Sequence, residues 1–258
     1  CSMYPNRHKI TTPVAVTGLA AVTALGNTLR EHETALESFR SGLRPLGELE
    51  GFDEKYSSIP AGWIRPRRLL SGNRFGPAAN LALLLAEQSV ADAGLDSESL
   101  RDAWLIVGTS RGNLAGWLAP WPHRSGHRQM HTSNSMHSEM AAAVSLRLGI
   151  NGPYHVVSNG CASGLDALGL AYWFVALGLA PRALVIAVDL PLVPALLESY
   201  AQTGLLSGNN VNDPYSPHTS GFLPGEGGAA LLLEPVNGLG ARPTYGCVRG
   251  YWGNSEAF

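Results

Sequence analysis

The sequence predicts an α/β layered domain with a mostly parallel or mixed sheet. Short β-branched runs alternate with longer Ala- and Leu-rich runs, and the short runs are apolar throughout. Alternation of strands and helices is typical of α/β domains, and strands without polar alternation are typical of sheets covered on both faces. With 258 residues, 45% of them hydrophobic, the chain is long enough for one sizeable core or two small ones.

The predicted elements follow one another along the chain. The β-branched runs predict strands at 14–17, 105–107, 155–158, 183–188 and 229–233, with a last strand around 244–252. The runs between them predict helices at 27–41, 73–93, 133–148, 162–177 and 191–203. Glycine follows the first four helices, as is typical of helix C-termini. Residues 42–68 and 114–132 predict long irregular loops, a kind that often binds ligands or covers sites.

Composition and charge exclude several classes of function. The 18 Lys and Arg residues nearly balance the 20 Asp and Glu residues, so electrostatic binding to nucleic acid is not expected. No stretch has the apolar length of a membrane span, and the N-terminus has no signal-peptide core. We expect a cytoplasmic protein, with a disordered or tag-like segment at 1–12 and one domain at 13–258. Three cysteines cannot form a disulfide framework, which leaves Cys161 free for chemistry.

Residues 154–167 place a cysteine where a predicted strand turns directly into a predicted helix. Gly160 and Gly164 permit a tight turn on both sides of Cys161. A thiol at a helix N-terminus is close to the positive end of the helix dipole and to N–H groups, which favour the reactive thiolate. The same N–H groups can bind an oxyanion. The pattern predicts a nucleophile; the alternative is a small buried apolar residue, the commoner role of a lone cysteine.

Residues 158–164, Ser-Asn-Gly-Cys-Ala-Ser-Gly, resemble the nucleophile motif T-A-C-A-S/T-S/G of the β-ketoacyl-ACP synthases. Six further segments resemble the family in the same order, at 14–27, 39–42, 73–95, 107–110, 221–229 and 250–258. Each segment is weak alone, but their common order over nearly the whole chain is specific.

The resemblance implies the N-terminal half of the thiolase fold, a five-layered αβαβα sandwich in which each half has a mixed five-stranded sheet with helices on both faces. It implies that Cys161 accepts an acyl chain from an acyl carrier protein, with its backbone N–H in the oxyanion hole. A decarboxylative Claisen condensation with malonyl-ACP then yields the β-ketoacyl product. The candidate acyl-pocket residues are Thr109, Ser110, Met136 and Met140, although core packing explains the two methionines equally well. The candidate supporting residues are Gly160, Ser163, Gly225 and Glu226. Neither a cofactor nor a metal is implied, because the carrier's phosphopantetheine is part of the substrate.

The sequence also departs from the family. The two catalytic histidines of the family belong to H-G-T and N-x-H motifs of its C-terminal half, and none of the eight histidines here has such a motif. Asn159 and Gly160 replace the usual Thr and Ala before the nucleophile. Three charges that tie down a loop in the family are replaced by Ser216, Thr219 and Ser220, which puts the geometry of that loop in question.

Two hypotheses of function therefore stand side by side. The first is an acyltransferase that elongates fatty acid, polyketide or polyene chains, favoured by the intact cysteine. The second is a non-catalytic subunit like a chain-length factor, which shapes the acyl tunnel of a partner ketosynthase. The predicted helix after Cys161 is apolar almost all round, so we expect a partner against it. That partner is a C-terminal half, a second copy in a homodimer, or a full-length ketosynthase in a heterodimer.

Two weaker patterns complete the candidate sites. His123, His127 and His131 are spaced by four, as metal ligands on one helix face would be. Pro122 and Gly126 interrupt such a helix, so a polar loop is the preferred interpretation. Arg65, Arg67 and Arg68 form a basic patch, which is either a solvated turn or a docking site for an acidic carrier protein.

Overall fold

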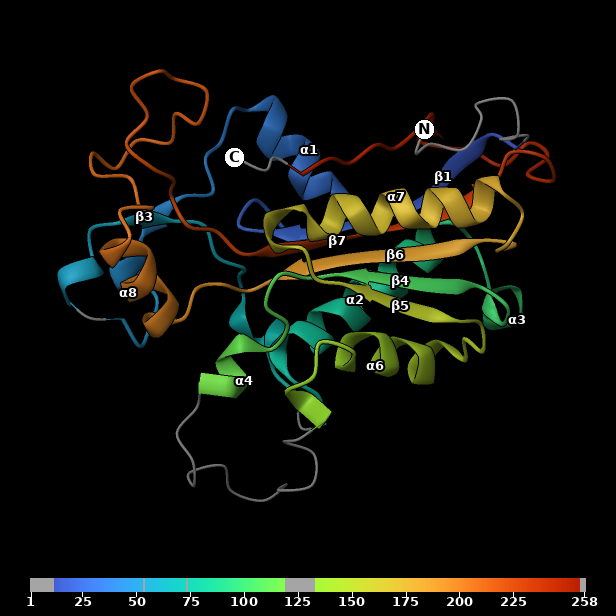
Figure 1. Ribbon diagram of the computed structural model, residues 1–258, viewed down its shortest axis with the longest axis horizontal. Helices are drawn as coiled ribbons and strands as arrows, with labels where there is room; N and C mark the ends of the chain where they lie inside the picture. Colours follow the sequence, from blue (N-terminus) through green and yellow to red (C-terminus); the bar gives the residue numbers. More distant parts are fainter. Residues whose placement is uncertain (1–11, 53, 73, 119–132, 256–258) are drawn as a thin grey trace.

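The structure of the protein is a computed structural model, which describes residues 12–52, 54–72, 74–118 and 133–255. Its main sheet has the strand order β5-β4-β6-β7-β1-β8 (Figure 1). The strands are β1 (Val14–Thr23), β4 (Trp104–Gly108), β5 (Tyr154–Val157), β6 (Ala183–Asp189), β7 (Gly227–Pro235) and β8 (Gly246–Val248). β4 pairs in parallel with β5 and β6, whereas β7 is antiparallel to β6 and β1, and β8 is antiparallel to β1. The predicted mixed sheet is confirmed, with six strands instead of five.

β1 extends well beyond the predicted strand at 14–17. Its pairing with β7 shifts between Val16 and Gly18, and then continues to Thr23. Gly18 packs against the backbone carbonyl of Ser89 in the neighbouring helix, where a Cβ would overlap that oxygen. The Gly-Leu-Ala-Ala sequence has low strand propensity, so packing and pairing with β7, not local preference, extend this strand.

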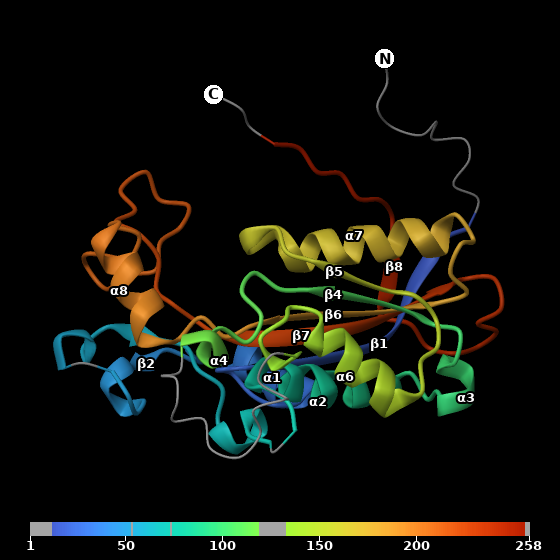
Figure 2. The ribbon, with the colours of Figure 1, turned by 60° about the horizontal axis from the view of Figure 1, so that its bottom comes forward.

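Helices cover both faces of the sheet, as predicted (Figure 2). α2 and α6 lie on one face and α7 lies on the other. The helices are α1 (Leu29–Glu37), α2 (Pro77–Asp92), α3 (Ser97–Leu100), α4 (Leu114–Leu118), α6 (Glu139–Leu148), α7 (Ser163–Ala176) and α8 (Pro194–Gln202). The five predicted helices all form but begin one to six residues later than expected; for α1 the cap is Thr28, in a capping box with Glu31, and not Asn27.

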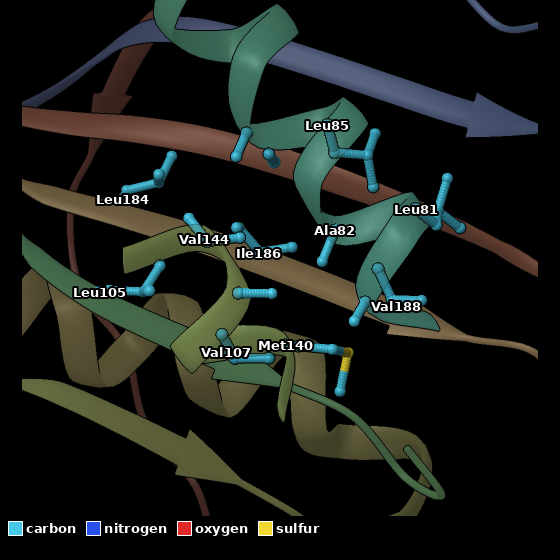
Figure 3. Packing of buried hydrophobic residues seen from close by; sticks show 14 of the residues in the cluster. Leu81, Ala82, Leu85, Leu105, Val107, Met140, Val144, Leu184, Ile186 and Val188 are labelled. Atoms are coloured by element: carbon cyan, nitrogen blue, oxygen red, sulfur yellow. The ribbon is translucent and has the colours of Figure 1, made fainter. Parts of the chain in front are cut away.

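The largest core cluster lies between the sheet and the α2–α6 layer (Figure 3). Branched side chains of β4 and β6 meet leucines of α2 and the apolar side of α6. The residues with labels are Leu81, Ala82, Leu85, Leu105, Val107, Met140, Val144, Leu184, Ile186 and Val188. A second cluster lies under α7, with Ala167, Ala171 and Val175 against Ile106 and Val185. These two clusters sandwich the sheet and explain its apolar strands.

The predicted irregular region at 42–68 contains regular structure with its own small core. A short hairpin of β2 (Arg44–Pro45) and β3 (Pro60–Ala61) brackets two 3₁₀ turns, η2 (Leu46–Glu48) and η3 (Glu54–Tyr56). A third 3₁₀ turn, η4 (Arg67–Leu70), precedes α2. The buried residues of this small core are Leu46, Tyr56, Ala61, Trp63, Leu192 and Leu197. Contacts between segments more than 100 residues apart hold this region, which explains why local sequence does not predict it.

Some predictions fall outside the described residues. The N-terminal segment, apart from Thr12, and the histidines at 123, 127 and 131 belong to the parts that the structure leaves undescribed. Within the described ranges, no helix has the length and apolarity of a membrane span. In the same ranges, no group of three or more His, Cys, Asp or Glu side chains is arranged to hold a metal ion.

Candidate active site

Cys161 lies in an exposed turn between β5 and α7. β5 ends at Val157, a 3₁₀ turn η5 covers Gly160–Ala162, and α7 begins at Ser163. Gly160 has φ of 54°, in the left-handed region where a side chain would be strained. Cys161 is a free and exposed thiol. The turn therefore presents the cysteine to solvent at the start of the helix, and the buried alternative is wrong for this chain.

Ser163 closes the turn on itself. Its hydroxyl donates to the carbonyl oxygen of Gly160 at 2.6 Å and accepts the N–H of Asn159 at 2.8 Å. The N–H of Ala162 donates to the carbonyl oxygen of Asn159 at 3.2 Å. Ser163 is only 1% exposed, and its two side-chain bonds are partly buried. Cys161 therefore lies in a turn whose first residue, Asn159, and last residue, Ser163, are hydrogen-bonded to each other.

The start of α7 packs closely against the end of β4. A Cβ at Gly108 would overlap the carbonyl oxygen of Ser163, so only glycine permits this approach. The N–H of Thr109 donates to the carbonyl oxygen of Val157 at 3.0 Å. The hydroxyl of Ser158 donates to the carbonyl oxygen of Ser110 at 3.3 Å. The structure therefore brings the candidate pocket residues Thr109 and Ser110 beside the cysteine turn.

Asp189 holds the 109–112 loop from the neighbouring strand. Its carboxylate, at the end of β6, accepts the N–H of Ser110 at 2.9 Å, the N–H of Arg111 at 3.2 Å and the hydroxyl of Thr109 at 3.3 Å. Burial raises the pKa of Asp189, and these hydrogen bonds oppose that shift. Sequence patterns alone do not single out Asp189; its position as the last residue of a buried strand is the signal that could have identified it.

A second carboxylate lies on the cysteine side of α7. Asp166, one turn into the helix, accepts a hydrogen bond from the side-chain amide of Asn159 at 2.6 Å. Its other oxygen accepts the hydroxyl of Tyr251, from the segment that follows β8. These donors, Asn159 first, hold the pKa of Asp166 below its usual range. Sequence spacing cannot reveal this contact, because residues 166 and 251 meet only in the folded chain.

The two candidate methionines lie in different environments. Met140, in α6, is 1% exposed and belongs to the main core cluster. Met136, ahead of α6, is 52% exposed. The structure thus places one of them as a core side chain and the other at the surface, and does not bring them together with Cys161.

Glu226 joins the 62–67 segment to the start of β7. It is 7% exposed, and its carboxylate accepts the N–H of Ile64 at 3.0 Å and a guanidinium N–H of Arg67. The N–H of Glu226 donates to the carbonyl oxygen of Gly62 at 2.9 Å, and Gly225 forms a parallel bridge with the same residue. Arg67 is therefore part of an ion pair and not a free member of the basic patch.

The loop that lacks the family's charges is tied by uncharged groups. Ser220 donates its hydroxyl to the side-chain oxygen of Asn209 at 2.8 Å, and Ser207 donates to the carbonyl oxygen of Val211 at 2.8 Å. Backbone bonds join Leu205 to Phe222 and Ser207 to Phe222. Hydroxyl and amide bonds therefore shape the 205–222 loop in place of the three charges.

Two ketoacyl synthases are similar to this chain in sequence. In the tetracenomycin polyketide synthase ketoacyl synthase alpha subunit of Streptomyces glaucescens, 28% of 215 aligned residues are identical, over 76% of this chain and 50% of that one. The 3-oxoacyl-[acyl-carrier-protein] synthase 2 of Synechocystis is 26% identical over 268 residues, or 95% of this chain and 63% of that one. The chain thus spans about half to two thirds of these relatives.

Solved structures share the fold at lower sequence identity. The ishigamide ketosynthase/chain length factor superposes with a TM-score of 0.77 at 21% identity, over 93% of this chain and 62% of that chain. The sequence model of the protein family "Beta-ketoacyl synthase, N-terminal domain" matches residues 11–237 of this chain. The α/β layers, the turn that presents Cys161 and this match together place the chain in the beta-ketoacyl synthase family, as a member that contains its N-terminal domain.

Proposed function

We propose that Cys161 accepts an acyl group from an acyl carrier protein thioester, as the first half-reaction of a β-ketoacyl synthase. The observation that carries this proposal is the exposed thiol in a closed turn at the start of α7, within a domain of this family. The N–H groups of Ala162 and Ser163 donate to carbonyl oxygens within the turn, so we assign the oxyanion to the backbone N–H of Cys161, as the family resemblance implies.

The chemistry is a thioester exchange. The Cys161 thiolate attacks the acyl carbonyl, a tetrahedral oxyanion forms, and the carbon–sulfur bond to phosphopantetheine breaks. The released pantetheine thiolate takes up the proton that left Cys161, so atoms and charge balance. In the second half-reaction malonyl-ACP loses CO₂, and its carbanion attacks the carbonyl of the Cys161 thioester. The carbon–sulfur bond to Cys161 breaks, which releases the Cys161 thiolate and leaves the β-ketoacyl product on the carrier protein. This step needs groups to stabilise the carbanion, and no histidine motif of this chain supplies them.

The surface around α7 supports a macromolecular partner. Leu165, Leu177 and Leu179 are 63%, 46% and 57% exposed on or beside this helix, and Tyr154 of edge strand β5 is 47% exposed. Exposed apolar groups of this kind mark surfaces that a protein partner covers. The proposed partner is a C-terminal half, a second copy or a full-length ketosynthase. Docking of the carrier protein is assigned to Arg68 and Arg65, since Arg67 is paired with Glu226.

Intact-mass spectrometry tests the acyl transfer. The protein is incubated with an acyl-ACP, and Cys161→Ala is compared with Cys247→Ala, which removes the other exposed thiol of the described residues. We expect one acyl adduct on the wild type and on Cys247→Ala, and none on Cys161→Ala. A wild type without adduct, alone and with a partner ketosynthase, overturns the proposal.

The second candidate function is a subunit like a chain-length factor. The exposed apolar side chains on and beside α7 favour it, because such a subunit pairs with a ketosynthase. Its test is the chain length of the product that a partner ketosynthase makes. We then expect product length to change with this protein present, and Cys161→Ala to produce the same change.

A further inference from the structure

Asn159, Asp166 and Tyr251 form a chain of hydrogen bonds that ends at the cysteine turn. Asp166 accepts from Asn159 through one carboxylate oxygen and from Tyr251 through the other. The ring of Tyr251 lies directly on Gly169, where a Cβ would overlap it. Tyr251 is therefore seated on the outer side of α7 by its ring and oriented by its hydroxyl.

Three polar groups of Asn159 have partners within this turn. Its N–H donates to Ser163, its carbonyl oxygen accepts from Ala162, and its side-chain amide donates to Asp166. Three anchors on one residue leave it little rotational freedom. Asn159 begins the turn that contains Cys161, so these three bonds restrain the backbone at the start of that turn.

The protonation states suit this arrangement at neutral pH. The hydrogen bonds from Asn159 and Tyr251 hold the pKa of Asp166 below its usual range, so the carboxylate is charged. The bond to Asp166 and burial raise the pKa of Tyr251, so its hydroxyl keeps the proton that it donates. A hydrogen bond to a charged acceptor is stronger than a neutral one.

We propose that Tyr251 and Asp166 are positioning residues that fix the Cys161 turn through Asn159 and thereby set the rate at which Cys161 reacts. The proposal rests on the proposed function of Cys161 as an acyl acceptor. It gives the segment after β8 a role at a turn about 90 residues earlier in the chain. It also explains the asparagine at position 159, since the shorter side chain of the family's usual threonine lacks an amide donor to reach Asp166.

The test compares two Tyr→Phe variants, each of which removes one hydroxyl. Tyr251→Phe keeps the ring on Gly169 and removes the bond to Asp166. Tyr245→Phe is the matched control, because it removes a bond to Asp92 of 3.1 Å at the end of α2, away from the cysteine turn. Two rates are measured on the full chain: alkylation of Cys161 by iodoacetamide, read by peptide mass spectrometry with glutathione as internal reference, and acylation by an acyl-ACP.

We expect Tyr251→Phe to slow both rates about threefold or more, the effect of losing one charge-assisted hydrogen bond, and Tyr245→Phe to leave both near wild type. A double-mutant cycle with Asn159→Ala separates positioning from general destabilisation. If Tyr251 acts through Asn159, the double variant reacts no more slowly than Asn159→Ala alone. Effects that multiply, or a Tyr251→Phe variant that reacts like Tyr245→Phe, overturn the proposal.

The two proposals fail in different ways. If wild-type Cys161 takes no acyl group but its alkylation responds to Tyr251→Phe as expected, the acyl-acceptor function is wrong and the positioning role stands. If wild-type Cys161 is acylated and Tyr251→Phe changes neither rate, the positioning role is wrong and the function stands. Thermal unfolding of each variant verifies that the compared proteins are folded.

Discussion

The carboxylate of Glu139, the first residue of α6, accepts the backbone N–H of Gly76 at 3.0 Å, immediately before α2. Its second oxygen accepts the side-chain amide of Asn113, whose own oxygen accepts the N–H of Ala78 at 2.8 Å. Two N–H groups at the start of α2 therefore have side-chain acceptors, which is the function of a helix cap. Glu139 is 5% exposed, and burial raises its pKa to about 7, with the two hydrogen bonds opposing the shift.

This raised pKa predicts a pH dependence of stability. The unfolded carboxyl ionises near 4.5 and the folded one near 7, so the folded state binds the proton more tightly. The stability contributed by protonated Glu139 is present below pH 4.5 and is lost as the pH rises through 7, by roughly 3 kcal/mol. Glu139→Gln removes this titration. We therefore expect the unfolding free energy of the wild type to fall relative to that of the variant as the pH rises over this range.

Urea denaturation at half-unit steps from pH 4.5 to pH 8 measures this difference. Glu98→Gln is the control, because Glu98 is an exposed residue of α3 that pairs with the exposed Arg101 at an N···O distance of 3.7 Å. Its variant should follow the wild type at every pH. A Glu139→Gln curve parallel to that of the wild type would show that Glu139 does not titrate in this range.

Ser163→Ala tests how strongly the cysteine turn is closed. The substitution removes the acceptor of the Asn159 N–H and the donor to Gly160, both in partly buried bonds of a buried side chain. The expected loss is about 1–3 kcal/mol of unfolding free energy, together with slower acylation of Cys161. Ser158→Ala, which removes one exposed bond of 3.3 Å, should cost less than about 0.5 kcal/mol. Equal losses in the two variants would contradict the account of the turn.

The sequence predicts the sheet and the five principal helices because their patterns are local. Apolar runs such as 183–188 become buried strands, and Ala/Leu-rich runs ended by glycine become helices. Helix starts are predicted less well. α6 begins at Glu139 and not at 133, because a turn at 135–138 separates it from the helical residues 133–134. Asn113 and Trp117 of another segment donate side-chain hydrogen bonds to the carbonyl oxygens of Asn134 and Ser135 there.

The site is divided in the same way between local and distant determinants. Cys161, Gly160 and Ser163 lie within four residues, so the sequence places them at one turn. Asp189 and Tyr251 reach the site through folding alone. Asp189 contacts the 109–112 loop, and Tyr251 contacts Asp166. The basic patch shows the converse. Arg67 is adjacent to Arg68 in sequence, but it forms an ion pair with Glu226, the residue immediately before β7.

Arg67→Ala should destabilise the protein far more than Arg68→Ala. Without Arg67, the buried Glu226 carboxylate keeps the Ile64 N–H as its partner among the described residues, and an uncompensated buried charge costs about 2–4 kcal/mol. Burial already raises the pKa of Glu226 and Arg67 opposes that shift, so the variant should raise it further.

The sign of the pH effect follows from this pair. A raised folded pKa means that the stability contributed by protonated Glu226 is lost as the pH rises through it. Arg67→Ala should therefore cost more at pH 8 than at pH 4.5, where protonation removes the charge. Chemical denaturation of both arginine variants at the two pH values measures this. A cost that is equal at the two pH values would mean that the ion pair contributes nothing.

Phe39→Gly should stabilise the protein although it removes a large side chain. Phe39 follows α1 with φ of 51°, and it is 96% exposed, so its ring contributes little packing. A non-glycine residue in the left-handed region costs about 1–2 kcal/mol, whereas the added freedom of glycine in the unfolded chain costs about 0.5–1 kcal/mol. The expected net gain is about 0.5–1 kcal/mol. Tyr215→Gly is the matched control, since Tyr215 is 99% exposed, does not have a positive φ and can only lose stability. Thermal unfolding should therefore shift in opposite directions for the two variants, and a shift in the same direction would show that strain at Phe39 does not limit stability.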